Sequence, residues 1–239
     1  MTKLIMRCLL VAAVGIISAC SSDNNNNQNT GTGGVVTPPP IQTKLFNVEF
    51  TNLTNAQPLS PVALVLHTEG QLWQLNQASS DALELLAEAG DNSAILAEDF
   101  VQDSVSGEGV VMPGVTRALA IEAPTSGDAY LSLATMLVNT NDAFTGFTRM
   151  DVSNMATNES VTLSIAAYDS GTEANSEAAG SIPGPADGGE GYNSVRDDVD
   201  FVARHPGVVT ADDGLTTSVL NESHRFDNPV IRVTVLRIR

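Results

Sequence analysis

Three carboxylates follow strand-like segments at positions where their side chains could meet. Asp169 and Glu173 stand four residues apart in Asp-Ser-Gly-Thr-Glu, at the end of the alternating run Val161–Tyr168. Asp142 follows a second strand-like run, Tyr130–Val138. The glycine between the first two acids permits a tight reversal of the chain. Because hard divalent cations prefer oxygen ligands, the three acids could hold calcium together with main-chain carbonyls and water. Solvated loop acids are the alternative that the residues leave open.

The segments that would position these acids are mainly strands. Apolar residues alternate or run together, between turn-forming residues, in six segments: Leu45–Thr51, Val62–His67, Arg117–Glu122, Tyr130–Val138, Val161–Tyr168 and Val230–Ile238. This pattern predicts an all-β antiparallel sandwich. Two short helices are expected between strands, Asp81–Ala89 and Ser93–Val101, the first capped by Ser80 and ended by Gly90. The Gly-, Pro- and Asp-rich stretch 174–229 is either a functional loop or contains short strands.

The N-terminus has the pattern of an exported lipoprotein. Lys3 and Arg7 precede an apolar run, Leu9–Ile17, which is shorter than a comfortable membrane span. The run closes in Ile-Ser-Ala-Cys, which resembles the cleavage box of bacterial lipoproteins with Cys20 as the lipid-bearing residue. We expect residues 1–19 to be a signal peptide and 20–43 to be a lipidated tether rich in Asn, Gly and Pro. Serines rather than Asp follow Cys20, which favours the outer membrane, on its periplasmic or its outer face.

The remainder, 44–239, is expected to form one acidic domain. Without residues 1–19 the chain has 9 basic and 28 acidic residues, a formal charge of −19. This balance argues against nucleic acid as a partner and makes divalent cations the natural counter-charge. Much of the acidity could simply keep an exported protein soluble. The only two cysteines are Cys8 and Cys20, so the predicted domain has no disulfide.

The domain resembles the spondin N-terminal domain family over most of its length. The resemblance is carried by the order and spacing of several pieces: Phe46-x-Val48-x-Phe50, Gln57-Pro-Leu-Ser-Pro61, His67, Ala87-Glu88-x-Gly90, Asp142, Tyr168-Asp-Ser-Gly-Thr-Glu173 and Arg232–Ile238. It implies a C2-like antiparallel β-sandwich that binds calcium at one end through acidic loops and acts in attachment to a surface protein or glycan. By resemblance, Asp142, Asp169 and Glu173 match the family's metal-binding acids. Ala143 and Tyr168 stand where the family has aromatic Trp residues.

Signs of catalysis are weak in this sequence. No pair among His67, His205 and His224 has the spacing of a helical zinc site. There is no Gly-x-Ser-x-Gly elbow and no phosphate-binding Gly-rich loop. Trp73 and Tyr192 could contact a carbohydrate or a partner, although single aromatics usually belong to a core or its rim. The sequence therefore favours a non-enzymatic, lipid-anchored binding or adhesion module with calcium. A metal-assisted hydrolase using the same acids and a purely structural envelope lipoprotein are the alternatives.

Overall fold

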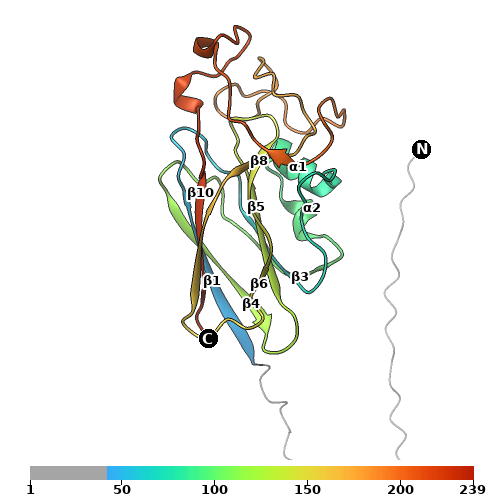
Figure 1. Ribbon diagram of the computed structural model, residues 1–239, viewed down its shortest axis with the longest axis vertical. Coiled ribbons are helices and arrows are strands. Elements are labelled where there is room, and N and C mark those ends of the chain that lie inside the picture. Colours follow the sequence, from blue (N-terminus) through green and yellow to red (C-terminus); the bar gives the residue numbers. More distant parts are fainter. Residues whose placement is uncertain (1–41) are drawn as a thin grey trace, which may run out of the picture. The chain divides into compact units, whose positions relative to one another are not determined.

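The computed structural model describes residues 42–239, which form a sandwich of two antiparallel sheets (Figure 1). One sheet has four strands in the order β4-β1-β10-β7, and the other has six in the order β3-β2-β5-β6-β8-β9. The strands are β1 (Thr43–Asn52), β2 (Ala63–His67), β3 (Val101–Ser106), β4 (Thr116–Pro124), β5 (Tyr130–Met136), β6 (Ala143–Asp151), β7 (Ser160–Ile165), β8 (Ala167–Asp169), β9 (Ala203–Arg204) and β10 (Ile231–Arg237). The predicted all-β antiparallel sandwich is confirmed. The predicted signal peptide, Cys20 and nearly all of the tether lie outside the described residues.

Strand β1 illustrates how alternation in the sequence becomes a core. Phe46, Val48 and Phe50 are at most 1% exposed, whereas Glu49 between them faces solvent. The three apolar side chains belong to the main cluster between the sheets. Burying one face of each sheet in this way removes apolar surface from water and holds the two layers together.

A second apolar cluster lies between the six-stranded sheet and helix α1 (Asp81–Ala89). The Ser80 hydroxyl accepts a hydrogen bond from the main-chain N–H of Leu83, and Gly90 ends the helix in the left-handed conformation with φ of 67°. Both caps are those the sequence predicts. Helix α2 (Ser93–Leu96) and two 3₁₀ turns, η1 (Ala211–Asp213) and η2 (Glu222–His224), complete the regular elements.

Three details of the architecture differ from the sequence predictions. The second predicted helix ends at Leu96, because from Val101 the chain pairs with β2 as strand β3. The predicted strand Val161–Tyr168 is broken at Ala166, where the chain crosses from the four-stranded to the six-stranded sheet. Strand β6 is absent from the prediction, since Gly146 interrupts its alternation. A Cβ at Gly146 would lie 1.8 Å from the carbonyl oxygen of Leu133, so this close approach to β5 requires glycine.

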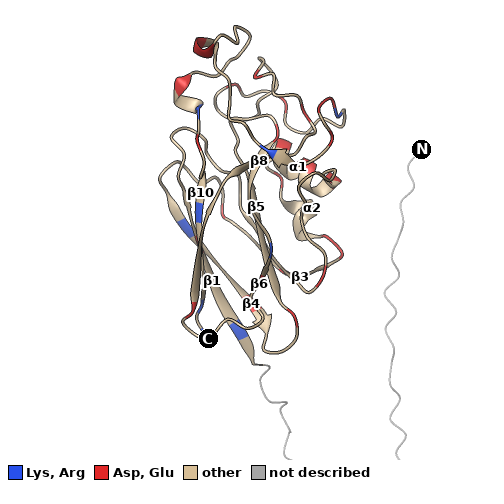
Figure 2. Cartoon of the chain, viewed as in Figure 1, with Lys and Arg blue, Asp and Glu red and all other residues tan. Residues whose placement is uncertain are grey.

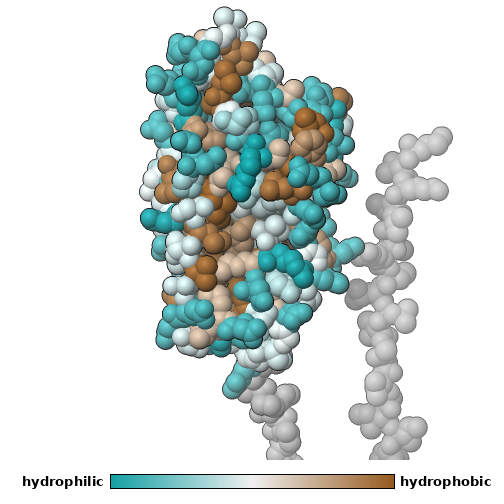
Figure 3. Space-filling view, viewed as in Figure 1, coloured by the Kyte–Doolittle hydropathy of each residue, from teal (hydrophilic) through white to brown (hydrophobic). Residues whose placement is uncertain are grey.

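Residues 41–239 form one compact unit. This unit contains both sheets and all three apolar clusters found in the described residues, so we expect it to fold without residues 1–40. None of the helices between residues 42 and 239 has the length and apolar character needed to cross a bilayer. On the face shown in Figure 3, apolar residues gather in a strip between hydrophilic margins.

Candidate metal centre

The turn between β5 and β6 delivers Asn141 and Asp142 to one end of the six-stranded sheet. The Thr140 hydroxyl closes this turn, donating to the carbonyl of Leu137 at 2.6 Å and accepting from the N–H of Ala143 at 3.1 Å. The Asn141 amide donates to the carbonyl oxygens of the neighbouring loop at 3.1 Å each. Asn141 is 2% exposed and Asp142 is fully buried. These hydrogen bonds therefore fix the positions of the Asn141 and Asp142 side chains, both of which carry oxygens.

The loop that leaves β8 wraps around the carboxylate of Asp142. Asp142 Oδ2 accepts hydrogen bonds from the hydroxyl of Ser170 at 2.8 Å, the N–H of Thr172 at 3.0 Å and the N–H of Glu173 at 3.2 Å. Gly171 makes the reversal possible, with φ of 75° and its N–H donating to Asp169 Oδ1 at 2.8 Å. The predicted tight turn between Asp169 and Glu173 is confirmed. One oxygen of Asp142 is thus satisfied by the loop, while the other is not.

Four buried oxygens near this junction have no hydrogen-bond partner among the described residues: Glu88 Oε1, Asn141 Oδ1, Asp142 Oδ1 and Glu173 Oε2. Every one is an oxygen acceptor, and they are the only buried side-chain polar atoms without a partner in residues 42–239. A buried polar atom without a partner is costly, so these four oxygens require a ligand that donates hydrogen bonds or supplies positive charge. A hard cation fits this donor set.

The electrostatics of the region also favour a bound cation. Burial, helped by the charge of Asp169, raises the pKa of Asp142 to about 7. Burial also raises the pKa of Glu173 to about 8, with further contributions from the charges of Glu88 and Asp142. Burial raises the pKa of Glu88 as well. Within residues 42–239 none of these carboxylates has an Arg or Lys ion-pair partner. The folded chain therefore groups three carboxyls here without a basic partner, so each favours its protonated form until a cation binds.

Helix α1 contributes Glu88, and the loop 190–200 closes over it. Glu88 Oε2 accepts a hydrogen bond from the N–H of Asn193 at 2.8 Å. One turn earlier, buried Glu84 pairs with Arg196, which also bonds Asp200 at 2.8 Å. These contacts hold the loop against the helix, and acidic residues recur along the chain around α1 (Figure 2).

An open polar pocket of about 310 Å³ adjoins the unpartnered oxygens. Asn141 and Glu173 line it, together with Glu190, Asn193 and Asp197 of the 190–200 loop. The site therefore has side-chain oxygens on its inner side and access to solvent on the other. A bound cation could keep water or a partner's oxygen among its ligands.

Asp169 is held differently from the other two predicted acids. Its Oδ1 accepts from Gly171, and its Oδ2 accepts from the amide of Asn175 at 2.7 Å. Asn175 is held in turn by His205, whose Nε2 lies 3.1 Å from the Asn175 amide oxygen. Because the N–H of Gly207 donates to His205 Nδ1, the proton of the ring is on Nε2 and points at Asn175. Burial lowers the pKa of His205 to about 4, so the ring is neutral and acts as a brace.

The structure brings together the three predicted acids only in part. Asp142 and Glu173 each direct an unpartnered oxygen into the region, whereas both oxygens of Asp169 are bonded within the protein. In residues 42–239 no three His, Cys, Asp or Glu side chains are close enough together to form a ready metal cage. The candidate donors are the carboxyls of Glu88, Asp142 and Glu173 and the amide of Asn141, and an ion that binds all four would have to draw them closer together. Neither Glu88 nor Asn141 belongs to the three-acid prediction.

Sequence reasoning missed Glu88 and Asn141 as site residues. Glu88 lies in the Ala-Glu-x-Gly piece that carries the family resemblance, and Asn141 immediately precedes Asp142, so both stood beside visible signals. No family model matches the chain, and no curated protein sequence matches it. The assignment of this centre therefore depends on its own geometry and chemistry.

Proposed function

We propose that the chain is a lipid-anchored binding module of the cell envelope, without enzymatic activity, whose loop end holds a calcium ion. The observation that carries the proposal is the set of four unpartnered buried oxygens on Glu88, Asn141, Asp142 and Glu173. The resemblance to the spondin N-terminal family supports the same ion at the same end of the sandwich. The anchor would be Cys20, with the domain held away from the outer membrane by the tether.

The four residues would supply four of the six to eight oxygens that calcium takes. Asp169 would act indirectly by shaping the turn that carries Glu173, or its side chain would rotate to give calcium a further oxygen ligand. The ion would neutralise the buried charge of Asp142 and Glu173 and fix the loops that form the partner surface. Its open positions would face the polar pocket, where water or a partner on another surface can reach them.

Calorimetric titration of calcium into a chelator-treated 41–239 fragment tests the proposal. Asp142→Asn is the sharpest variant, because an amide oxygen can keep the bonds to Ser170, Thr172 and Glu173 while its NH₂ group replaces the unpartnered oxygen. Asp128→Asn, an exposed acid in the loop between β4 and β5, is the matched control. We expect one equivalent of calcium to bind to the wild type and to Asp128→Asn, and none to Asp142→Asn. Absence of binding to the wild type at millimolar calcium would refute the proposed site.

The same preparation separates a binding module from the alternatives. A calcium-dependent increase in attachment of the lipidated chain to cell-envelope fractions would support the binding function. Calcium that stabilises the domain but leaves attachment unchanged would favour a structural role. Turnover that disappears with Asp142→Asn would favour the hydrolase.

A further inference from the structure

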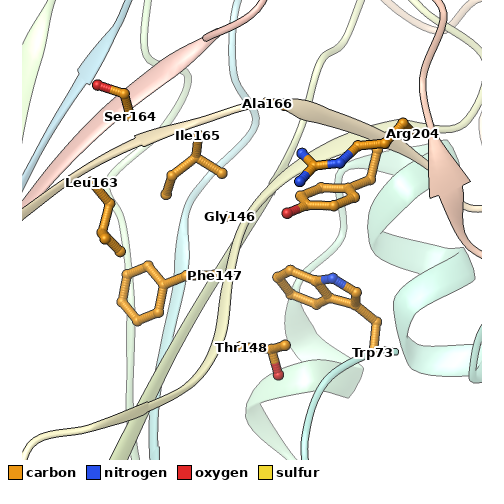
Figure 4. Close-up of a pocket in the computed structure, with 10 residues that line it drawn as sticks. Trp73, Gly146, Phe147, Thr148, Leu163, Ser164, Ile165, Ala166 and Arg204 are labelled. Carbon is orange, nitrogen blue, oxygen red and sulfur yellow. The ribbon is translucent and has the colours of Figure 1, made fainter. Parts of the chain in front are cut away.

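A groove opens on the side of the sandwich where the chain crosses from one sheet to the other. Strand β8 pairs with β6 only from Ala143 to Thr145, so the rest of β6 has no strand on that side within residues 42–239. The groove has a volume of about 560 Å³. Phe147, Leu163 and Ile165 line one part of it, and Trp73 and Arg204 line the other (Figure 4). Tyr168 also lines the groove.

Strand β7 presents a free edge to this groove. It is the last strand of the four-stranded sheet in the described chain and pairs only with β10. Leu163 lies opposite Val233, and the carbonyl of Ile165 accepts from Val230 at 2.9 Å. Because main-chain groups of an antiparallel strand point alternately to its two sides, those of Thr162 and Ser164 point to the free edge. Strand β7 contains neither Lys nor Pro, which commonly protect such an edge.

Two aromatic side chains of the groove, Trp73 and Tyr168, already pack against other rings. Phe144, Tyr168 and Arg204 are cross-strand neighbours on β6, β8 and β9. The Phe144 and Tyr168 rings stack at 5.4 Å, and the Arg204 guanidinium carbon lies 4.5 Å from the centre of the Tyr168 ring. Trp73 is only 8% exposed. Few aromatic faces remain free to stack on a sugar ring, so the groove is better suited to a peptide.

Arg204 gives the groove a charge preference. It is exposed and has no ion pair or hydrogen bond with any residue of the described chain, whereas Arg196, Arg225 and Arg239 each pair with a carboxylate. Its stacking on Tyr168 holds the guanidinium in place with its donors free. A guanidinium held in this way is complementary to a carboxylate.

We propose that this groove binds an extended acidic peptide segment of a partner protein, which adds to β7 as a further strand and places a carboxylate on Arg204. Main-chain hydrogen bonds to Thr162 and Ser164 would supply part of the affinity. Alternate side chains of the peptide would pack against Leu163 and Phe147. The groove does not include the four oxygens of the metal centre, so this binding does not depend on calcium.

Selection from a displayed library of random peptides on the 41–239 fragment, in buffer with chelator, tests the proposal. We expect enrichment of peptides that alternate apolar residues and contain an acid. A selected peptide is then synthesised with a fluorophore and titrated by anisotropy against the wild type and three variants. Thr162→Pro removes an N–H that faces the free edge, and Arg204→Glu reverses the charge. Arg117→Glu is the control, since Arg117 lines the groove between β3 and β4 on the other open side.

Each of the first two substitutions should weaken binding by about tenfold or more, which corresponds to losing one charge-assisted contact or part of a strand ladder. Arg117→Glu should leave binding unchanged. If Thr162→Pro melts at a lower temperature than the wild type, its weaker binding could come from destabilisation. The binding of Arg204→Glu then decides whether the proposal holds. Failure to enrich any peptide, peptides that bind Arg204→Glu as well as the wild type, or binding of a glycan in place of peptides would overturn the proposal.

Discussion

The strand-built body of the sandwich and its loop end bury different kinds of groups. Between the sheets, the large fully buried side chains are apolar, such as Phe46, Leu133 and Val233, and a buried polar one such as Thr135 is hydrogen-bonded. At the loop end, the fully buried side chains include Glu88 and Asp142, and an oxygen of each has no partner in the described chain. The first region maximises its own stability, whereas the second keeps costly groups in place. Since buried charge is retained only where something compensates it, the difference points to the loop end as the functional part.

The largest effect should come from the body and should be independent of calcium. Phe46→Ala leaves a cavity at a fully buried position, so we expect a loss of about 3–5 kcal/mol in the free energy of unfolding. Urea denaturation with calcium and with chelator would measure it. Leu53→Ala, at a position 41% exposed, is the control and should cost far less. A Phe46→Ala effect that vanishes in calcium would contradict the separation of the two regions.

Calcium should give the next largest effect, and it should act on the loop end alone. At 100 times its dissociation constant, a bound ion adds about 2.7 kcal/mol of stability, or roughly 5–10 °C in melting temperature for a domain of this size. Asp142→Asn should remove this gain and, because it eliminates a buried charge, should not destabilise the metal-free domain. Scanning calorimetry of both proteins checks this. An equal calcium shift in the two would place the ion elsewhere.

Breaking the pair that holds the 190–200 loop on α1 should have a smaller effect. Arg196→Ala leaves Glu84 buried without its partner, at a cost of about 1–3 kcal/mol. In Arg196→Ala, amide hydrogen exchange should be faster than in the wild type in the 190–200 loop and unchanged in the sheets. Arg239→Ala removes a pair whose partners are both largely exposed, Arg239 and Glu122, and should cost less than about 1 kcal/mol. Similar losses from the two substitutions would show that the loop is not held by Arg196.

The smallest effect should be a pH dependence of the metal-free domain. Asp142 and Glu173 have folded-state pKa values of about 7 and about 8, above those of an unfolded chain. The folded state therefore holds protons that the unfolded state has released, and stability falls as pH rises toward 8. His205 works in the opposite direction only below its ordinary pKa of 6.5, because its folded pKa is lowered to about 4. From about pH 6.5 to 8, the effect of Asp142 and Glu173 is therefore not opposed by His205.

Melting curves in chelator across that window should show a falling melting temperature, with a shallower slope for Asp142→Asn. With calcium present, affinity should rise over the same window, because the ion displaces the protons. A melting temperature that rises with pH in chelator would show that these carboxylates are not buried as described.

The body of the domain could be predicted from local patterns in the sequence. The alternation of β1 and the caps of α1 are short-range features, since each depends on residues within a few positions of one another. The turn from Asp169 to Glu173 is local for the same reason. Strand β6 was not predicted, because Gly146 breaks the alternation of its residues where the strand packs closely against Leu133. The crossing at Ala166 likewise depends on which sheet offers a partner.

The candidate site could be predicted only where its parts were local. Glu88 has the appearance of a surface acid on a helix, and its burial is produced by a loop about 100 residues later that donates to it from Asn193. Asn141 has the appearance of an exposed turn residue in the sequence, but its amide is buried and donates to carbonyls of the loop after β8. Contacts over such separations have no periodicity to reveal them. The unpartnered oxygens became visible only when these segments were placed together.

Diffraction from crystals of the 41–239 fragment grown with calcium, recorded at a wavelength where calcium scatters anomalously, would test directly whether the loop end holds the ion. We expect one strong anomalous peak bounded by oxygens of Glu88, Asn141, Asp142 and Glu173 at about 2.3–2.6 Å. Water molecules bonded to these four oxygens, with no anomalous peak beside them at millimolar calcium, would contradict it.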